Sequence, residues 1–423
     1  MTTLRNFWNS MRTSYWFVPT GFGSIAIGLV ILFTLWDELP QKSSFLAPFQ
    51  VNRDLAHLIL TTIAAATVTV MGTAFSVVVV VLSLSSQQFG PRLPRTFLKD
   101  TVTQVTLGAF FGTSLFCLLS LRSLGKDSPV ELFVLSALLM ILLCLITLIY
   151  FIHHIAHLIQ APTVVARVTE DADEAIQTDF PMTVGNPSKE AVQPELHFNW
   201  EVRSPKEGYC QIIDGAGLFE IAKEYNRVIK VAVLPGDFVA FNQIIFRLNG
   251  VAPEKALVKK LASMLELGVL RTPVQDIGCA IDELVEIAVR ALSPGVNDPF
   301  TACNCVDRLA ALLVRYSEGS PRNHHRADES GKLRVVFTEL NFEMLWDRSF
   351  TSIRHYGKES FEVNLRLLRA HRYAFKEIKE VKHLEHILQH SELVEMNQAY
   401  FPKYDGDKIQ AQAKLIRQEA KIL

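Results

Sequence analysis

Long apolar stretches alternate with short polar segments over the first 160 residues of the chain. Four of these stretches contain no Lys, Arg, Asp or Glu: Phe17–Trp36, Leu58–Leu84, Val102–Leu121 and Leu132–Ile152. A bilayer core about 30 Å thick is crossed by roughly 20 apolar residues in a helix. The pattern therefore predicts a transmembrane domain of four helices over residues 1–160.

The rest of the chain has the shorter periodicities of a water-soluble region. We expect the fourth helix to continue to about Ala166, within a connecting helix and loop over 161–207. A small β-rich module over 208–250 and a mostly helical domain over 251–423 follow. The predicted fold class is therefore membrane α-helical, with four transmembrane helices joined to a cytoplasmic α+β region.

The β-rich module begins at Gly208 and contains the turn Pro235-Gly236-Asp237. Its pattern resembles the barrel-sandwich hybrid of lipoyl and biotinyl carrier domains, which implies a small barrel-sandwich-like fold. No lysine stands at the hairpin tip, where such carriers take their prosthetic group. We therefore expect an interaction or assembly module without a cofactor.

Charge separates the two parts and indicates the topology. Residues 1–160 carry nine basic and six acidic side chains, and residues 161–423 carry 33 basic and 37 acidic ones. The second part is therefore slightly acidic and has no basic stripe, so we expect no nucleic-acid partner. Cytoplasmic loops are enriched in Lys and Arg. The N-terminus and second loop hold five such residues, Arg5, Arg12, Arg92, Arg95 and Lys99, and the first and third loops hold four, Lys42, Arg53, Arg122 and Lys126. We therefore expect both termini to be cytoplasmic.

The second span carries a polar stripe. Its members are spaced so that they share one side of a helix: Thr62, Thr69, Thr73, Ser76, Ser83 and Gln87. One interpretation is tight helix packing, with hydroxyls bonding across helices. The alternative is the wall of a water-filled pore, in which hydroxyls partly replace the hydration shell of an ion. Either function requires the stripe to face protein or water rather than lipid.

The other spans indicate close packing and argue against some transport mechanisms. Gly108 and Gly112 form a small-x-x-x-small pair that favours helix association, as do Ser24 and Gly28. Proton relays and voltage sensors need ionisable residues within the membrane. Since the four apolar stretches have no charged residue, a proton-coupled pump or a voltage-gated channel is disfavoured.

Histidine and cysteine patterns predict no metal site and no disulfide framework. Histidines gather after the fourth span and near the C-terminus: His153, His154 and His157, and His383, His386 and His390. Imidazoles three or four residues apart suit a metal. No acidic residue or cysteine completes the first group, and the second lies on a helix with charged neighbours, so interfacial and surface positions are expected. The six cysteines lack a disulfide spacing and predict thiols in a reducing compartment.

A sharp corner follows a predicted helix in the C-terminal domain. The helix is expected to begin at Thr272 and to end at Ser293, and Pro299 starts the next one. One interpretation is that the polar residues of this region only cap the helices and form the tight turn between them. Alternatively, three of them are ligands or interface contacts: Asp276, Asn297 and Asp298.

Catalytic signatures are missing from the sequence. It contains no Gly-rich phosphate loop, no G-x-S-x-G elbow, no H-E-x-x-H and no paired C-x-x-C sites. We therefore expect no catalytic residues and no enzymatic activity.

Four strings of the sequence resemble one family: Phe75-Ser76-Val77, residues 85–92, residues 151–156, and the run R-A-L-S-P-G-V-N-D-P-F-T at residues 290–301. It is a bacterial domain-of-unknown-function family of predicted four-span membrane proteins. The resemblance implies a location in the bacterial cytoplasmic membrane and supplies no activity. Cys303 and Cys305, just after the last string, are given no family role.

The combined observations favour a homo-oligomeric, channel-like protein of the lipid bilayer, for which they identify neither the ion nor any ligand. The second span would line the pore, and the cytoplasmic region would assemble or gate it. The alternative is a membrane-anchored scaffold or sensor without transport activity, in which the spans only pack.

Overall fold

The computed structural model describes residues 17–36, 51–90, 100–124, 130–177, 184–188, 197–318 and 324–421. The chain divides into two compact units, Met1–Thr163 and Val164–Leu423. Most of the basic residues used to predict the topology lie outside the described residues: Arg5, Arg12, Lys42, Arg92, Arg95, Lys99 and Lys126.

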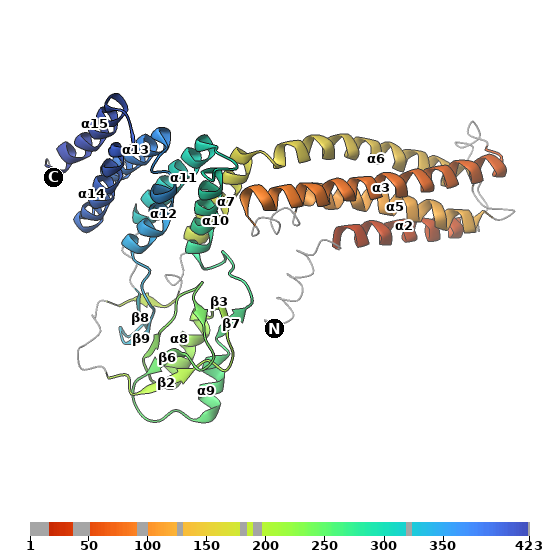
Figure 1. Ribbon diagram of the computed structural model, residues 1–423. Coiled ribbons are helices and arrows are strands. Elements are labelled where there is room, and N and C mark those ends of the chain that lie inside the picture. Colours follow the sequence, from red (N-terminus) through yellow and green to blue (C-terminus); the bar gives the residue numbers. More distant parts are fainter. Residues whose placement is uncertain are drawn as a thin grey trace. The chain divides into compact units, whose positions relative to one another are not determined.

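Within its described residues, the first unit contains four helices that are long and apolar enough to cross a membrane, as the hydropathy pattern predicts. They run alongside one another (Figure 1) and are α2 (Phe17–Trp36), α3 (Arg53–Phe89), α5 (Thr101–Ser123) and α6 (Val130–Leu158). Helix α5 is the central one: it contacts the other three, and 61% of its most apolar window is buried, against 22% in each of the others. Three phenylalanine rings with centroids 5.7–6.3 Å apart form the core beside it: Phe33, Phe116 and Phe133.

Helix α3 is longer than a bilayer requires. Its 37 residues span about 55 Å at 1.5 Å per residue, whereas the hydrocarbon core is about 30 Å thick. Part of α3 therefore extends beyond the apolar region of a membrane.

The fourth helix does not continue to Ala166 as the pattern suggested. Helix α6 ends at Leu158, and α7 (Ala161–Gln177) begins after a two-residue interruption. Pro162 explains the break, because it has no N–H and favours the first turn of a new helix.

The described residues of the second unit form two sheets. The larger has the strand order β1-β8-β9-β4-β6-β2, and the smaller has the order β5-β3-β7. The strands are β1 (Asn186–Pro187), β2 (Trp200–Arg203), β3 (Gly208–Ile213), β4 (Ile229–Val231), β5 (Phe238–Val239), β6 (Ile244–Leu248), β7 (Leu265–Gly268), β8 (His325–Ala327) and β9 (Leu333–Val336). All pairings are antiparallel except that of β4 with β9.

The sheets extend beyond the 208–250 range predicted for the β-rich module. Strand β2 lies in the segment expected to be a loop, yet it pairs with β6. Strands β8 and β9 come from more than 70 residues further along, and β9 joins β4 in parallel. Helices α8 (Gly215–Glu224) and α9 (Lys255–Ala262) place Leu218 and Leu261 in the apolar core between these elements.

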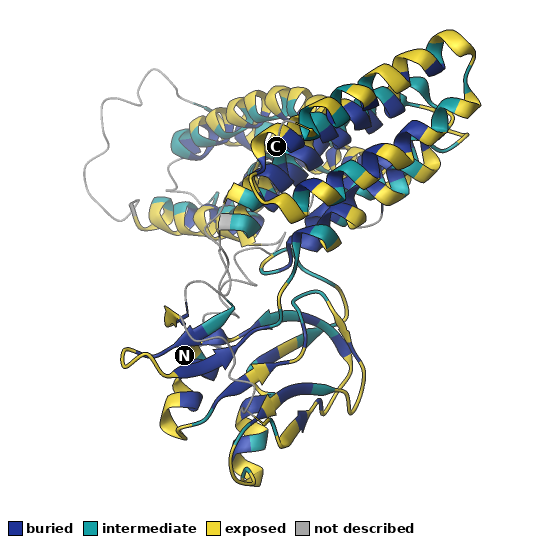
Figure 2. Ribbon diagram, turned by 90° about the vertical axis from the view of Figure 1, so that its left-hand side faces the viewer, coloured by how far each residue is buried: buried dark blue, intermediate teal, exposed yellow. Residues whose placement is uncertain are grey.

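The C-terminal part consists of packed helices. They are α10 (Ile277–Ala291), α11 (Pro299–Glu318), α12 (Phe342–Tyr356), α13 (Phe361–Glu377), α14 (Val381–Glu395), a 3₁₀ turn (Met396–Tyr400) and α15 (Lys403–Ala420). Each helix buries one side and exposes the other, as Figure 2 shows by colour. This is the pattern of amphipathic helices that share one core.

Helix α10 begins later than predicted. Its first residue is Ile277, and Asp276 is the N-cap, which accepts a hydrogen bond from the N–H of Cys279 at 3.1 Å. The preceding Gln275 is used elsewhere, because its side-chain amide bonds both backbone groups of Ile213 in β3. This contact holds the segment before Asp276 in a non-helical conformation, so the helix cannot begin earlier.

Candidate functional site

The polar stripe of the second span lies on the surface of α3 that the bundle does not cover. All six residues of the stripe are exposed: Thr62, Thr69, Thr73, Ser76, Ser83 and Gln87. The packed side consists of Ala56, Leu60, Ile63, Ala64, Thr67, Ala74, Val78, Val81, Ser85 and Phe89. At about 100° per residue, the centres of these two sets lie nearly opposite each other on the helix. The stripe therefore has no packing role inside the four-helix bundle.

Four hydroxyls of the stripe donate hydrogen bonds to the carbonyl four residues earlier. The donors are Thr62, Thr69, Thr73 and Ser76, at oxygen–oxygen distances of 2.7–3.1 Å. Such bonds satisfy the hydroxyl proton within the helix. Because these residues are exposed, the lone pairs of the hydroxyl oxygens remain able to accept from water or another helix or to bind an ion.

Exposed residues on α2 and α6 are mainly large and apolar. Those more than half exposed are Ile25, Ile31 and Leu35 on α2, and Leu139, Leu142, Leu143, Ile146, Ile149, Tyr150 and Ile152 on α6. Such surfaces match lipid tails. Helix α2 also exposes three hydroxyl residues, Thr20, Ser24 and Thr34, so α3 differs among the described spans by the greater length of its polar row.

The small pair of the third span lies at the contact between α5 and α2. A Cβ atom added to Gly112 would lie 3.1 Å from the backbone oxygen of Phe22, and one added to Gly108 would lie 3.2 Å from the Cα atom of Pro19. Gly28 of the other small pair faces open space. Gly108 and Gly112 therefore let two helix backbones approach within one chain.

A hydrogen-bonded contact between an aspartate and a histidine, which the sequence reasoning missed, lies at one end of the bundle. Asp100 caps α5 and accepts hydrogen bonds from the N–H and hydroxyl of Thr103. Its other oxygen is 2.8 Å from Nε2 of His154, while the rings of His153 and His157 contact each other at 4.6 Å between centroids. The capping pattern Asp-x-x-Thr was visible in the sequence, but its contact with a distant helix was not.

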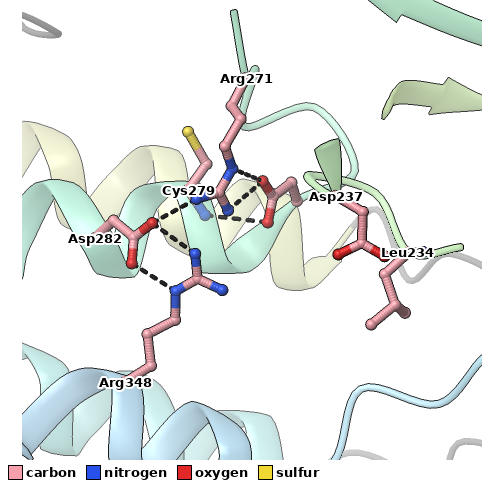
Figure 3. A network of polar contacts seen from close by, with 7 residues as sticks. Leu234, Asp237, Arg271, Cys279, Asp282 and Arg348 are labelled. Carbon is pink, nitrogen blue, oxygen red and sulfur yellow. Dashed lines mark hydrogen bonds and ion pairs between the residues drawn. The ribbon is translucent and has the colours of Figure 1, made fainter. Parts of the chain in front are cut away.

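Asp276 belongs to a network of charges in the second unit, of which Figure 3 labels Arg271, Asp282 and Arg348. Arg271 lies between Asp276 and Asp282, with nitrogen–oxygen distances of 2.5 Å to each. Asp282 also binds the guanidinium of Arg348 in α12 at 2.5 and 2.6 Å. Only 12% of the Arg271 side chain and 4% of the Asp276 side chain are exposed. The network therefore joins the segment before α10, α10 itself and α12.

The turn at residues 234–237 packs directly on this network. Gly236 has a φ of 92°, and a Cβ atom at this position would lie 2.1 Å from Oδ2 of Asp276. Asp237 stabilises the turn by accepting a hydrogen bond from the N–H of Leu234 at 2.8 Å. The Pro-Gly-Asp string thus forms a contact between the β-sheet region and α10.

The charges of the network affect its two carboxyl groups differently. Burial raises the pKa of Asp276 above its ordinary value, although the guanidinium of Arg271 opposes this effect. Burial acts in the same direction on Asp282, but hydrogen bonds and charges from Arg348 and Arg271 outweigh it and lower the pKa of Asp282.

Asn297 and Asp298 do not join Asp276 in one site. Helix α10 separates them from it, a rise of about 20 Å at 1.5 Å per residue. Asp298 accepts hydrogen bonds from the N–H groups of Phe300 and Thr301 and caps α11. Asn297 is exposed and has a φ of 48°, a left-handed conformation in which asparagine is enriched. Both residues thus have a local structural function at the corner.

A small cavity lies beside the Arg271 network. Its volume is about 50 Å³, and its lining includes Val233, Pro235, Gln275, Tyr316 and Thr338. Ligand pockets for small molecules typically measure about 300–1,000 Å³. This cavity has room for a few water molecules and none for a substrate of ordinary size.

All six cysteines fall within the described residues, are buried, and form no disulfide with one another. Burial raises the pKa of the Cys210 thiol to about 12. A thiol with so high a pKa is not an activated nucleophile at neutral pH.

Comparisons with known proteins agree with the membrane architecture. Residues 12–372 match a family described as "Predicted membrane protein (DUF2254)". An uncharacterized protein of Mycobacterium tuberculosis is 27% identical over 374 residues, which cover 82% of this chain and 69% of the relative, and an uncharacterized protein of Mycobacterium bovis matches to the same extent. No solved structure gives a significant match. The chain therefore belongs to the DUF2254 family of predicted membrane proteins.

Proposed function

We propose that this protein is a homo-oligomeric, channel-like protein of the bacterial cytoplasmic membrane, in which α3 of each subunit faces a shared pore. The observation that carries the proposal is the position of the polar stripe, opposite the packed side of α3 and exposed in the single chain. Hydroxyl groups facing lipid tails gain nothing, whereas at a pore they can contact water and ions.

The number of spans supports an assembly rather than a pore within one chain. The centre of the four-helix bundle is filled by α5 and by a phenylalanine cluster, so the bundle interior is a packed core. A pore therefore requires the outer surfaces of several subunits. With both termini in the cytoplasm, the second unit would lie on the cytoplasmic side, where its helices and sheets would assemble or gate the channel.

The first experiment measures the mass of the detergent-solubilised particle. One chain has a mass of 47.6 kDa. We expect a single species of a defined multiple of this mass, after subtraction of the detergent. A strict monomer would contradict the proposed assembly.

The second experiment measures ion flux in proteoliposomes under K⁺ and Cl⁻ gradients, using wild type, Ser76→Leu and Val77→Leu. Leucine at Ser76 places an apolar side chain on the stripe and should reduce flux at least tenfold. Val77 is also exposed, at nearly the same depth but about 100° away round the helix, so Val77→Leu should conduct like wild type.

The particle mass of Ser76→Leu distinguishes a pore from a packing surface. Lost flux with an unchanged mass supports a pore lined by the stripe. A smaller particle indicates that the stripe packs between subunits. Absence of flux from the wild-type oligomer would contradict channel activity for both ions.

One observation favours the alternative of a membrane-anchored scaffold or sensor. Because four of the five stripe hydroxyls bond to their own helix, lipid contact would leave the protons of those four satisfied. For such an anchor, Ser76→Leu and Val77→Leu would behave alike, and neither protein would conduct.

A further inference from the structure

Three side chains able to bind a metal converge between two helices of the C-terminal part. Oδ1 of Asp347 in α12 lies 2.8 Å from Nε2 of His386 and 2.7 Å from Nε2 of His390, both in α14. The ligand atoms of all three residues lie within 4.8 Å of one another. Two residues of one helix and one residue of its neighbour therefore point toward a common centre.

The cluster is held by the fold and is open to solvent on one side. His386 and His390 are four residues apart, so they share one surface of α14, which packs against α12. Only 6% of the His390 side chain is exposed, compared with 53% of that of Asp347. Behind His390 lies the fully buried ring of His371, at 6.3 Å between centroids. An ion could enter from the side of Asp347, while the buried histidines define the rear wall.

We propose that Asp347, His386 and His390 form a binding site for a divalent transition-metal ion with the ligand preference of Zn²⁺. Two imidazole nitrogens and one carboxylate oxygen are a donor set typical of zinc, whereas Mg²⁺ and Ca²⁺ prefer oxygen ligands alone. A pair of histidines at positions i and i+4 of a helix is a known zinc-binding geometry. Three protein ligands leave the fourth tetrahedral position to water.

Two of the three distances between ligand atoms need little change to accept the ion, and the third pair, the two histidine nitrogens, lies within 4.8 Å. In a tetrahedral site with bonds of about 2.0–2.1 Å, neighbouring ligand atoms are roughly 3.3 Å apart. The two nitrogen–oxygen distances would therefore lengthen by about half an ångström as the metal replaces the shared protons. The carboxylate also supplies a negative charge, which matters because Arg354 interacts electrostatically with both Asp347 and His390 and weakens the attraction for a cation.

A competing explanation is a polar clamp in which Asp347 accepts one hydrogen bond from each histidine. The clamp would join α12 and α14 without an ion. It satisfies Oδ1 of the carboxylate, and, like the metal site, it leaves Nδ1 of the buried His390 without a hydrogen-bond partner. The two explanations differ in one measurable property, which is stoichiometric retention of metal.

The test uses the full-length protein in detergent, purified with a tag that contains no histidine. The protein is stripped with EDTA, equilibrated with ZnCl₂ and desalted, and its zinc content is measured by mass spectrometry. We expect one zinc ion per chain and a higher thermal unfolding midpoint in the presence of zinc, because an ion that binds only the folded state stabilises it. Co²⁺ in place of Zn²⁺ should give the visible absorption of a four-coordinate site.

Four variants separate this site from adventitious binding. Asp347→Asn, His386→Gln and His390→Gln should each lower zinc affinity by about 100-fold or more, since even outer contacts of zinc sites contribute 10- to 100-fold. His383→Gln is the matched control, because His383 lies one turn away in the same helix and contacts Glu380 at 3.2 Å. It should retain one zinc ion.

His386→Gln decides the outcome if the buried His390→Gln variant fails to fold, because His386 is partly exposed and its replacement is tolerated more easily. A folded wild-type protein that retains no zinc after desalting would overturn the proposal. So would a His386→Gln protein that retains zinc as well as wild type does.

Discussion

Gly236 is the residue at which the turn at 234–237 contacts the Arg271 network. The need for a glycine in this contact can be tested separately from the need for a glycine at a positive φ. At φ 92° an alanine is strained, and its Cβ would also lie 2.1 Å from a carboxylate oxygen of Asp276. We therefore predict that Gly236→Ala lowers the thermal unfolding midpoint of the second unit by several degrees.

Gly250→Ala is the control for this substitution. Gly250 has a φ of 85° but no atom within 4 Å of an added Cβ. Its replacement should cost only the left-handed strain, about 1–2 kcal/mol, whereas Gly236→Ala adds displacement of a buried charge pair. Unfolding of both variants is monitored by near-UV circular dichroism. If the two substitutions lowered stability equally, the contact with Asp276 would contribute nothing.

Residues that carry chemistry were predicted from the sequence only where their partners are local. Asp298 could be recognised as a helix cap because the N–H groups it binds follow within three residues. The spacing of His386 and His390 indicated a possible metal pair, but the expected surface position is wrong for His390, which is buried. Asp347 and the Asp276–Arg271 pair were missed, because nothing in the sequence around a carboxylate indicates which distant residue folding brings close to it. The polar stripe of α3 could be recognised from its spacing, but its position on the outer side depends on where α5 packs.

At the scale of elements, the close approach of α2 and α5 depends on two glycines. An added Cβ at Gly112 would press on the backbone of Phe22 at 3.1 Å, and backbone cannot rotate away as a side chain can. Gly112→Leu should therefore force the helices apart and destabilise the bundle by about 1–3 kcal/mol, as overpacking does. The measurement is the thermal midpoint of the detergent-solubilised protein.

Gly28→Leu is the matched control for this contact, since Gly28 lies in α2 with nothing within 4 Å of an added Cβ. It should be neutral or slightly stabilising, because leucine is a better helix former than glycine. If Gly112→Leu melted no lower than Gly28→Leu, close packing of α2 on α5 would not limit stability.

The elements themselves differ in how far the sequence predicts them. The four apolar helices follow from hydropathy, which is a local property, and their predicted positions agree with the structure. The larger sheet was predicted only in part, because β9 joins β4 about 100 residues away along the chain. Such a pairing depends on how the whole segment between the two strands folds. The sequence itself predicts only that the short apolar run of β9 is a strand, not which strand it pairs with.

At the scale of the whole molecule, the charge network makes the stability of the second unit depend on pH. The folded-state pKa of Asp282 is lowered, so its ionised form binds Arg348 and Arg271 more strongly than it binds water. This contribution is fully present above the ordinary pKa of 3.8 and is lost as the pH falls through the lower folded-state value. Asp276, whose pKa is raised, contributes with the opposite sign.

The informative quantity is therefore the difference in thermal unfolding midpoint between full-length wild type and Asp282→Asn, measured from pH 7 to pH 3. Asparagine cannot ionise, so the variant should melt well below wild type at pH 7, where two guanidinium groups lose their shared carboxylate. Removing one partner of a buried ion pair costs about 3–5 kcal/mol, and Arg348, whose side chain is 37% exposed, places the expected loss at the lower end of that range. The difference should shrink below about pH 4, as wild-type Asp282 takes up its proton. A difference that stays constant down to pH 3 would mean that Asp282 stabilises the junction of α10 and α12 through its shape rather than through its charge.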